Sequence, residues 1–112
     1  MLYSKTNLLS NAMSAYARRM DAISGNIANM DTPGYRRVNV SFEDRLQKVL
    51  SGPGGEKAAG DVGPSMELED KPPVLEDELM DMADTQMRNQ MAVRALHDHF
   101  GMLRSGITGR SG

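Results

Sequence analysis

The two histidines are the first residues to test for chemistry, because imidazole serves as a general base and as a metal ligand near neutral pH. They stand at His97 and His99. On a helix, side chains two residues apart point roughly 200° away from each other, so this pair cannot hold one metal ion together. We interpret both as solvated or packed side chains and expect no metal site and no cofactor.

Carboxylates gather ahead of the histidines, with eight acidic residues between Met66 and Asp84 against one base, Lys71. They lack the glycine-bearing loop of alternating acids that binds calcium. Beyond Asp84 the balance reverses to four arginines against Asp98. Leading acids and trailing bases complement the macrodipole of a helix, so this pattern indicates a solvated helix rather than a ligand site.

The remaining motifs exclude several function classes. No Gly-x-Ser-x-Gly elbow activates a serine, and the glycine-rich stretch lacks the Gly-Lys-Ser/Thr ending of a phosphate-binding loop. The 112 residues contain no cysteine and carry a net charge of −2, with adjacent basic pairs only at Arg18–Arg19 and Arg36–Arg37. We therefore expect neither an enzyme nor a nucleic-acid-binding protein, and no small-molecule substrate.

A 4,3 spacing of apolar or small residues runs through the first thirty residues and predicts a helix over residues 1–30. This 3.5-residue repeat is that of a coiled-coil seam. Arg19 lies off the seam and is expected to face outward. Thr32 precedes a proline and Pro33-Gly34 suits the centre of a type II turn, so the helix ends before them. The seam consists of Leu9, Met13, Tyr16, Met20, Ile23 and Ile27, with Leu2, Thr6 and Met30 at its ends.

Residues 31–50 are predicted to form a turn, a short extended piece and a short helix. Val38, Val40 and Phe42 alternate with polar residues, but the piece is too short to found a sheet. Ser41 resembles a capping box residue with Asp44, opening a helix from about Phe42 to Leu50. Residues 51–73 hold five glycines and four prolines and are predicted to be a flexible connector.

The seam resumes over residues 74–107, which are predicted to form the second long helix. Its members are Leu75, Leu79, Met82, Gln86, Asn89, Val93, Leu96, Phe100, Leu103 and Ile107, and a second stripe holds Met80, Met87 and Met91. The expected fold class is all-α, a single domain over residues 1–112 in which the two terminal helices pack as an antiparallel coiled-coil hairpin. One hairpin covers one stripe per helix, so the remaining apolar surface predicts contact with other chains.

The run from Ser24 to Arg36 resembles the Asn-Ile-Ala-Asn-x-x-Thr-Pro-Gly-Tyr signature of the flagellar axial proteins, the rod, hook and hook-associated subunits. Its expected assembly residues are Asn26, Asn29, Thr32, Pro33, Gly34 and Tyr35. The short span between the long helices is similar to that of the FlgB-type rod subunits, and the FlgC type is the closest alternative within the family.

The resemblance implies a structural subunit of the proximal rod of the bacterial flagellar basal body, part of the drive shaft that transmits motor torque. It implies as partners other rod subunits, the rod-to-MS-ring adaptor, further copies of the chain in a helical assembly and the flagellar type III export apparatus. It also implies synthesis in the cytoplasm, export without a cleaved signal peptide and a final place in the periplasmic rod. The alternative from another class is a cytoplasmic helical adaptor or export chaperone.

Overall fold

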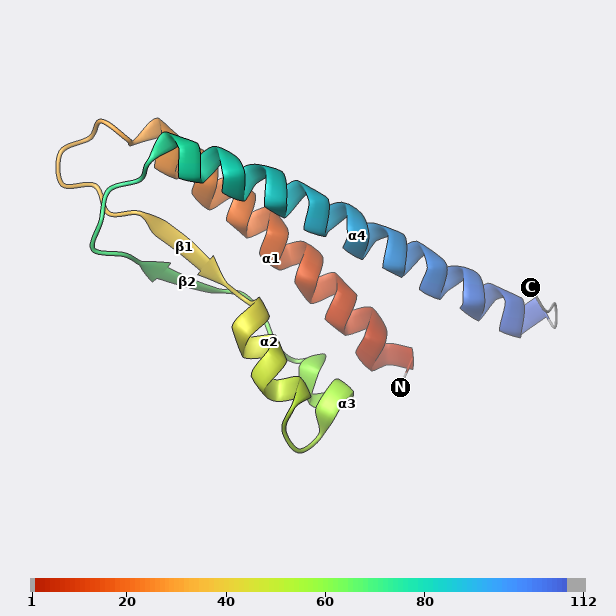
Figure 1. The fold of residues 1–112 in the computed structure, drawn as a ribbon. Coiled ribbons are helices and arrows are strands. Elements are labelled where there is room, and N and C mark those ends of the chain that lie inside the picture. Colours follow the sequence, from red (N-terminus) through yellow and green to blue (C-terminus); the bar gives the residue numbers. More distant parts are fainter. Residues whose placement is uncertain (1, 109–112) are drawn as a thin grey trace.

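The computed structural model describes the backbone of residues 2–108 and the side chains of residues 5–107. The predicted helix start at residue 1 and the side chain of Leu2 lie outside that range. In chain order the elements are α1 (Leu2–Ala28), β1 (Val38–Ser41), α2 (Glu43–Leu50), α3 (Gly55–Ala59), β2 (Ser65–Leu68) and α4 (Leu75–Thr108) (Figure 1). The mainly helical fold with two long terminal helices is confirmed.

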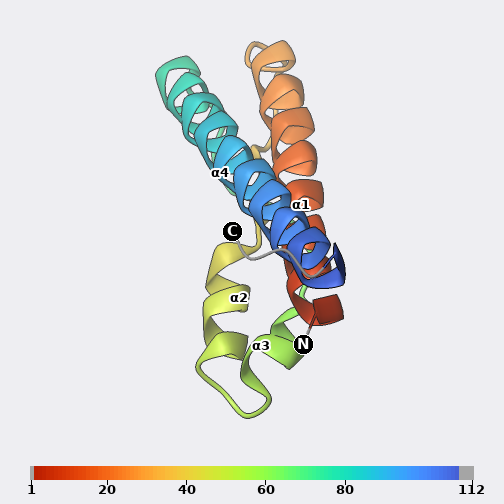
Figure 2. The same cartoon turned by 90° about the vertical axis from the view of Figure 1, so that its right-hand side faces the viewer.

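The molecule is elongated and thin. Its principal extents are 60 × 29 × 14 Å and its radius of gyration is 17.1 Å, against about 13 Å for a compact chain of this size. The helices α1 and α4 run in opposite directions along each other, and Figure 2 shows α2 and α3 beside the end of this pair where the chain begins. So thin a shape cannot enclose a large core.

The core is small and centres on the middle of α1. Ala12, Ala15 and Tyr16 contribute from α1, and Phe42, Val62 and Ala92 pack against them from three other segments. The rings of Tyr16 and Phe42 meet edge to face, with centroids 6.5 Å apart. Phe42 is the largest fully buried side chain, and burying such a ring contributes about 1.5–3 kcal/mol to folding.

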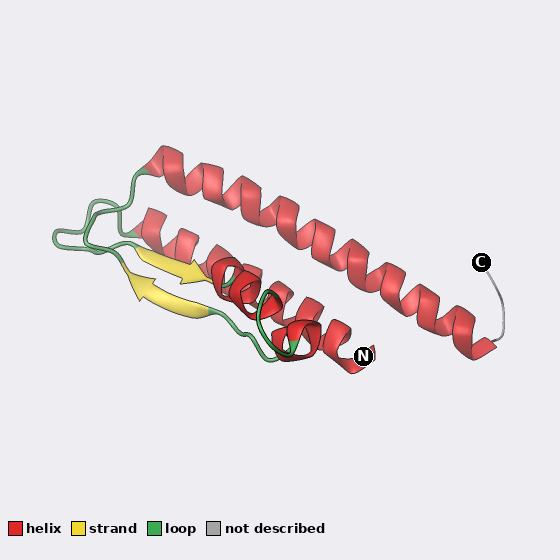
Figure 3. Ribbon diagram, turned by 60° about the horizontal axis from the view of Figure 1, so that its bottom comes forward, coloured by secondary structure: helices red, strands yellow, loops and turns green. Residues whose placement is uncertain are grey.

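Two short strands correct the all-α prediction. Strand β1 pairs antiparallel with β2, from Val38 opposite Leu68 to Ser41 opposite Ser65. Figures 1 and 3 show α1 between α4 and this sheet. The extended piece does found a sheet because it finds a partner in the predicted connector and buries Val40. A pairing between strands this far apart in sequence leaves no mark on local periodicity.

The predicted connector, residues 51–73, contains regular structure. Besides β2 it holds α3, and Ala59 and Val62 are buried. Gly54 has φ +90°, a left-handed conformation that glycine adopts at little cost, and it turns the chain into α3. The side-chain Nδ2 of Asn11 donates to the carbonyl of Gly60 at 2.8 Å and ties the segment to α1. A few small apolar residues are enough to hold this segment in place because it packs against α1.

The predicted capping box at Ser41 is wrong. The residue that caps α2 is Phe42, and it makes no side-chain capping bond. The amide of Leu46 bonds to the carbonyl of Phe42 at 2.9 Å. The helix therefore begins where the buried Phe42 ring fixes the chain, and Glu43 and Asp44 in its first turn complement the macrodipole.

Neither long helix, over the part of the chain that the structure describes, has a stretch apolar enough to cross a lipid bilayer.

Candidate functional site

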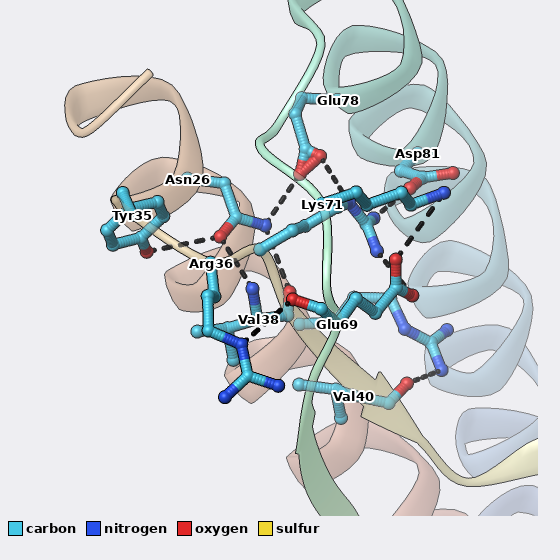
Figure 4. Close-up of polar contacts among 11 residues, drawn as sticks. Asn26, Tyr35, Arg36, Val38, Val40, Glu69, Lys71, Glu78 and Asp81 are labelled. Carbon is cyan, nitrogen blue, oxygen red and sulfur yellow. Dashed lines mark hydrogen bonds and ion pairs between the residues drawn. The ribbon is translucent and has the colours of Figure 1, made fainter. Parts of the chain in front are cut away.

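Asn26 is the centre of the site, fully buried on the last full turn of α1. Its Nδ2 donates to the carbonyl of Val38 at 2.9 Å and to Oε1 of Glu78 at 2.6 Å. Its Oδ1 accepts from the amide of Val38 at 2.9 Å and from the hydroxyl of Tyr35 at 3.2 Å (Figure 4). Both donors and both acceptor positions of the side-chain amide are used. One side chain thus joins α1, the turn, β1 and α4.

Glu78 is the second buried polar residue of this group and lies in the first turn of α4. Its Oε2 accepts from Nε of Arg37 at 3.0 Å. Arg37 also reaches Oε1 of Glu69 at 3.1 Å and Oδ2 of Asp81 at 2.7 Å. Removing one partner of a buried ion pair costs about 3–5 kcal/mol, because the other charge is left uncompensated. The four side chains and Asn26 form what we call the Asn26 cluster.

The charges around Arg37 also set its protonation. Burial lowers the pKa of Arg37, but the hydrogen bond that Arg37 donates to Glu78 and the charges of Glu78, Glu69 and Asp81 outweigh this effect, so the pKa stays above its ordinary value. Arg37 is therefore a permanent cation among carboxylates, and the cluster is a fixed ionic joint.

The rest of the signature forms the turn. Asn29 Nδ2 donates to the carbonyl of Gly25 at 2.9 Å, and the Thr32 hydroxyl donates to Asn29 Oδ1 at 3.2 Å. The Tyr35 amide bonds to the Thr32 carbonyl at 3.1 Å and Gly34 has φ +75°, as the predicted type II turn requires. Thr32, Pro33 and Gly34 are exposed. Of the six predicted assembly residues, Asn26 belongs to the Asn26 cluster and Tyr35 donates a hydrogen bond to it, while the others shape the turn.

A second ionic group joins α1, α2 and α4. Arg19 pairs with both carboxylate oxygens of Glu43, at 2.5 and 2.7 Å, and donates to the carbonyl of Val40 at 2.9 Å. Arg88 lies 3.4 Å from Glu43 and 2.8 Å from Asp84. The expectation that Arg19 faces outward is wrong, because its side chain reaches across to Glu43 and is only 15% exposed.

This second group lines a polar cleft of about 310 Å³ between α1, β1 and α4. Burial raises the pKa of Glu43, but the hydrogen bond from Arg19 and the charges of Arg19 and Arg88 outweigh that effect and hold the pKa below its ordinary value. The charged groups named here neutralise one another. We interpret the arrangement as a joint between helices.

The seam residues of α1 lie on its inward face. Tyr16 and Ile23 are buried, and the other four, Leu9, Met13, Met20 and Ile27, are half-buried. The line from residue 9 to residue 27 is therefore the packed face of α1.

On α4 the packed face differs from the predicted seam. Its most buried members are Glu78, Thr85, Ala92 and His99, seven residues apart. The half-buried seam residues are Met82, Asn89, Leu96 and Leu103, whereas Leu75, Leu79, Gln86, Val93, Phe100 and Ile107 are exposed. Glu78 belongs to the Asn26 cluster and lies on this inward face, and the neighbouring seam positions Leu75 and Leu79 face outward.

The histidines point apart as predicted, with His97 exposed and His99 buried beside the ring of Phe100 at a centroid distance of 6.2 Å. Between residues 2 and 108, no three His, Cys, Asp or Glu side chains come together as a metal site.

Sequence reasoning missed the residues that complete the site, namely Arg37, Glu69, Glu78 and Asp81 in the first group and Arg19, Glu43 and Arg88 in the second. Arg37 stood out only as half of a basic pair, and Glu78 only as one acid among several in a helix start. The sequence did contain one signal at Glu78. This residue is not part of the apolar seam, yet it lies seven residues before Thr85 and fourteen before Ala92 and so shares one helix face with them.

Comparison with known proteins bears on the same segment. The sequence pattern of the family described as flagella basal body rod protein matches residues 7–36, from α1 through the signature turn. The flagellar basal body rod protein FlgB of Buchnera aphidicola is 36% identical over 53 residues, 44% of this chain and 40% of that protein. The FlgB of Escherichia coli K12 is 41% identical over 39 residues, 35% of this chain and 28% of that protein.

A third relative, the FlgB of Borreliella burgdorferi, is 50% identical over 32 residues, 29% of this chain and 24% of that protein. In each case the match spans less than half of the relative's own length. The resemblance to FlgB-type flagellar basal body rod proteins is confirmed, and the match to the rod-protein family pattern covers the segment that contains Asn26 and the turn.

Proposed function

We propose that this chain, which belongs by its N-terminal signature with the FlgB-type flagellar basal body rod proteins, is a structural subunit of the flagellar rod. The observation that carries the proposal is that two residues of the signature, Asn26 and Tyr35, make the hydrogen bonds that join the long helices and the sheet. Asn26 and Tyr35 fasten the end of α1 to β1 and to the start of α4 through bonds of 2.6–3.2 Å. Residues of the signature thus join the end of α1 to β1 and to the start of α4.

The physical character of the fold supports a role in assembly. A thin molecule with large apolar side chains exposed along α4 leaves surface that packing against other subunits would cover. Met80 is 71% exposed and Phe100 is 51% exposed. The outward-facing α4 line of Leu75, Leu79, Val93, Phe100 and Ile107 then acts as a coiled-coil seam between subunits, not within one.

The ionic joints suit a part that carries load. A rod that transmits torque needs subunits that do not shear internally, and the joints at Arg37–Glu78 and Arg19–Glu43 link α1, the sheet, α2 and α4. In this proposal the whole chain acts as one domain, and the segment between residues 51 and 73 packs with it.

The proposed partners are other rod subunits, the adaptor between rod and MS ring, and the flagellar type III export apparatus that delivers the chain. The proposed location is the periplasmic rod of the basal body, reached from the cytoplasm without cleavage of a signal peptide. The matches to rod proteins disfavour a helical adaptor or export chaperone, and the relatives named above are of the FlgB rather than the FlgC type.

The test is genetic and biochemical. Deleting the gene for this chain in its flagellated host should abolish hooks and filaments, and the plasmid-borne chain should restore them. Immunoblots should place the restored chain in purified basal bodies. Normal filaments in the deletion strain, or a chain confined to the cytoplasm of complemented cells, would exclude a rod subunit.

A further inference from the structure

The small sheet has an unpaired edge on its outer side. In Figures 1 and 3, β1 lies between α1 and β2, so β2 is the outermost element of the sheet. Strand β2 pairs with β1 along one of its edges. Over the part of the chain that the structure describes, no strand pairs with its other edge, and residues 66–68 are exposed.

The pairing with β1 fixes which backbone groups of β2 point to the free edge. The amide of Glu69 bonds at 2.8 Å to the carbonyl of Arg37, which directly precedes β1. In an antiparallel strand the backbone groups of successive residues alternate between the two edges. The N–H and C=O groups of Met66 and Leu68 therefore point to the free edge, where an added strand can bond to them.

The side chains of the same two residues form an apolar patch beside this edge. Met66 is 60% exposed and Leu68 is 58% exposed. They lie opposite Val40 and Val38, and residues opposite each other in a sheet share a face. Val40 is buried because α1 packs mainly against β1, which leaves the same face of β2 open. A further strand would cover Met66 and Leu68 with apolar side chains of its own.

Glu67, between these two residues, determines the charge of the partner. Its side chain is exposed and forms no ion pair with any residue that the structure describes, whereas Glu69 and Asp70 are paired with arginines. Pairing Met66 of one copy with Leu68 of another would place two Glu67 side chains opposite each other. Like charges directly opposite destabilise a sheet, so the edge favours a basic residue of a different protein.

We propose that the free edge of β2 binds an extended segment of a different protein as an added antiparallel strand. The segment carries apolar residues opposite Met66 and Leu68 and a lysine or arginine opposite Glu67. In this mode of recognition, backbone hydrogen bonds supply affinity and alternate side chains supply specificity. The pairing is a property of the isolated chain, so it goes beyond the proposed rod function and does not depend on it.

A synthetic peptide tests the pairing. The probe is acetyl-Gly-Thr-Val-Lys-Val-Thr-Gly-amide, titrated into the isotope-labelled full chain and followed by NMR. The largest shifts should occur at the amides of residues 65–69, and the amide hydrogens of Met66 and Leu68 should exchange more slowly with solvent. No shift at millimolar peptide, or shifts that leave β2 unaffected, would overturn the proposal.

N-methylation of the peptide provides a matched pair of controls. Because Met66 and Leu68 bond to the residues directly opposite them, both valines of the peptide donate to β2, while the lysine N–H points away. N-methylation of the two valines should weaken binding by about tenfold or more, since it removes two hydrogen bonds. N-methylation of the lysine should leave binding nearly unchanged. Equal effects of the two modifications would show that backbone pairing does not hold the peptide.

Substitutions in the chain test the other side of the contact. Leu68→Pro removes an outward N–H but no bond to β1, and proline is tolerated at such an edge position. It should weaken binding severalfold more than Leu68→Ala, which keeps the N–H. Glu67→Lys should make the chain prefer a peptide with glutamate in place of the lysine, whereas Glu56→Lys, an exposed position on α3, should leave the preference unchanged.

Circular dichroism of each variant checks that helix content is unchanged. Equal binding by Leu68→Pro and Leu68→Ala, or an unaltered charge preference in Glu67→Lys, would contradict the proposed pairing. A second copy as the occupant gives a different result. The amide signals of Met66 and Leu68 would then shift with protein concentration in the absence of peptide, and the proposal would be wrong.

Failure of this contact and failure of the proposed function are distinguishable. A chain that enters basal bodies but does not bind the peptide retains its rod function, and only the role of the β2 edge is excluded. A chain that binds the peptide through β2 but never enters basal bodies retains this binding edge, and the rod function is excluded.

Discussion

The side chain of Asn26 connects more separate segments of the chain by hydrogen bonds than any other side chain of the Asn26 cluster described above. Its amide holds the backbone of Val38 from both sides and meets the carboxylate of Glu78. An apolar residue of similar size would fill the space but would leave Glu78 bonded to Arg37 alone.

We predict that Asn26→Ala lowers the free energy of unfolding by about 3 kcal/mol, because it removes a buried partner of Glu78 and of the Val38 peptide groups. Urea titration followed by circular dichroism measures the loss. Asn7→Ala, an exposed position on the same helix, should change stability by less than about 0.5 kcal/mol. Equal losses for the two variants would show that the cluster bonds contribute nothing beyond helix propensity.

Arg19 and Arg18 offer an adjacent pair with opposite environments. Arg19 holds Glu43 and the Val40 carbonyl, whereas Arg18 is exposed. Arg19→Ala should cost about 2 kcal/mol, since a charge-assisted pair is lost and the contact that Glu43 keeps to Arg88 is longer. Arg18→Ala should be nearly neutral. Thermal unfolding of both variants makes the comparison, and a neutral Arg19→Ala would restore the outward-facing reading of this residue.

The pH dependence of this joint follows from the lowered pKa of Glu43. A carboxyl whose folded pKa is depressed contributes its stability in full above its ordinary value of 4.5, and the contribution is lost as the pH falls through the folded value. Glu43→Gln should therefore be less stable than wild type at pH 7, and the difference should shrink below pH 4.5. A gap that stays constant down to pH 3 would contradict the assignment.

At the scale of elements, the segment between α2 and α4 is part of the packed structure. Loop length by itself costs little, so a disordered connector would tolerate change. This one buries Ala59 and Val62, supplies β2 and takes a hydrogen bond from Asn11 to Gly60.

We predict that Val62→Asp destabilises the chain by about 2–3 kcal/mol, because it places a carboxylate against Tyr16 and Phe42 in the core. Lys57→Asp, exposed on α3, should have little effect on unfolding. Limited proteolysis gives an independent measure, since Val62→Asp should open cleavage within residues 51–73. Wild-type resistance in Val62→Asp would mean that the segment packs independently of its apolar contacts.

At the scale of the whole molecule, folding and assembly use different apolar surfaces. The inward line of α1 holds the chain together, and the outward line of α4 remains for other subunits. Ile23 is buried while Phe100 is half exposed. Mutations on the two lines should therefore separate the two processes.

We predict that Phe100→Ser leaves the unfolding midpoint of the isolated chain within the range of surface substitutions, about 0.5 kcal/mol, yet sharply reduces its incorporation into basal bodies. Ile23→Asp should instead unfold the chain, because a buried carboxylate without a partner costs several kcal/mol. Urea titration and immunoblots of basal bodies, read together, distinguish the two. Normal incorporation of Phe100→Ser would remove the outward line of α4 from the assembly surface.

The sequence by itself determined the elements whose causes are local. The 4,3 spacing and the Pro33-Gly34 turn placed α1 close to its observed end at Ala28, and the renewed 4,3 spacing from Leu75 placed α4. Helix periodicity and turn chemistry depend on residues within a few positions of one another, so a short stretch of sequence is enough to predict them. The signature around Asn26 and Tyr35 also indicated the family by the same local reading.

Only the tertiary structure decided which face of α4 packs, where β1 finds its partner and which way Arg19 points. Each is settled by groups far apart in the chain, as Asn26 and Glu78 are by 52 positions and Arg37 and Glu78 by 41. An apolar stripe predicts that a helix face is buried, but it does not identify the partner of that face. The packed face of α4 contains Glu78, whose ionic and hydrogen-bond partners come from α1 and from the segment before β1, and no local pattern brings these residues together.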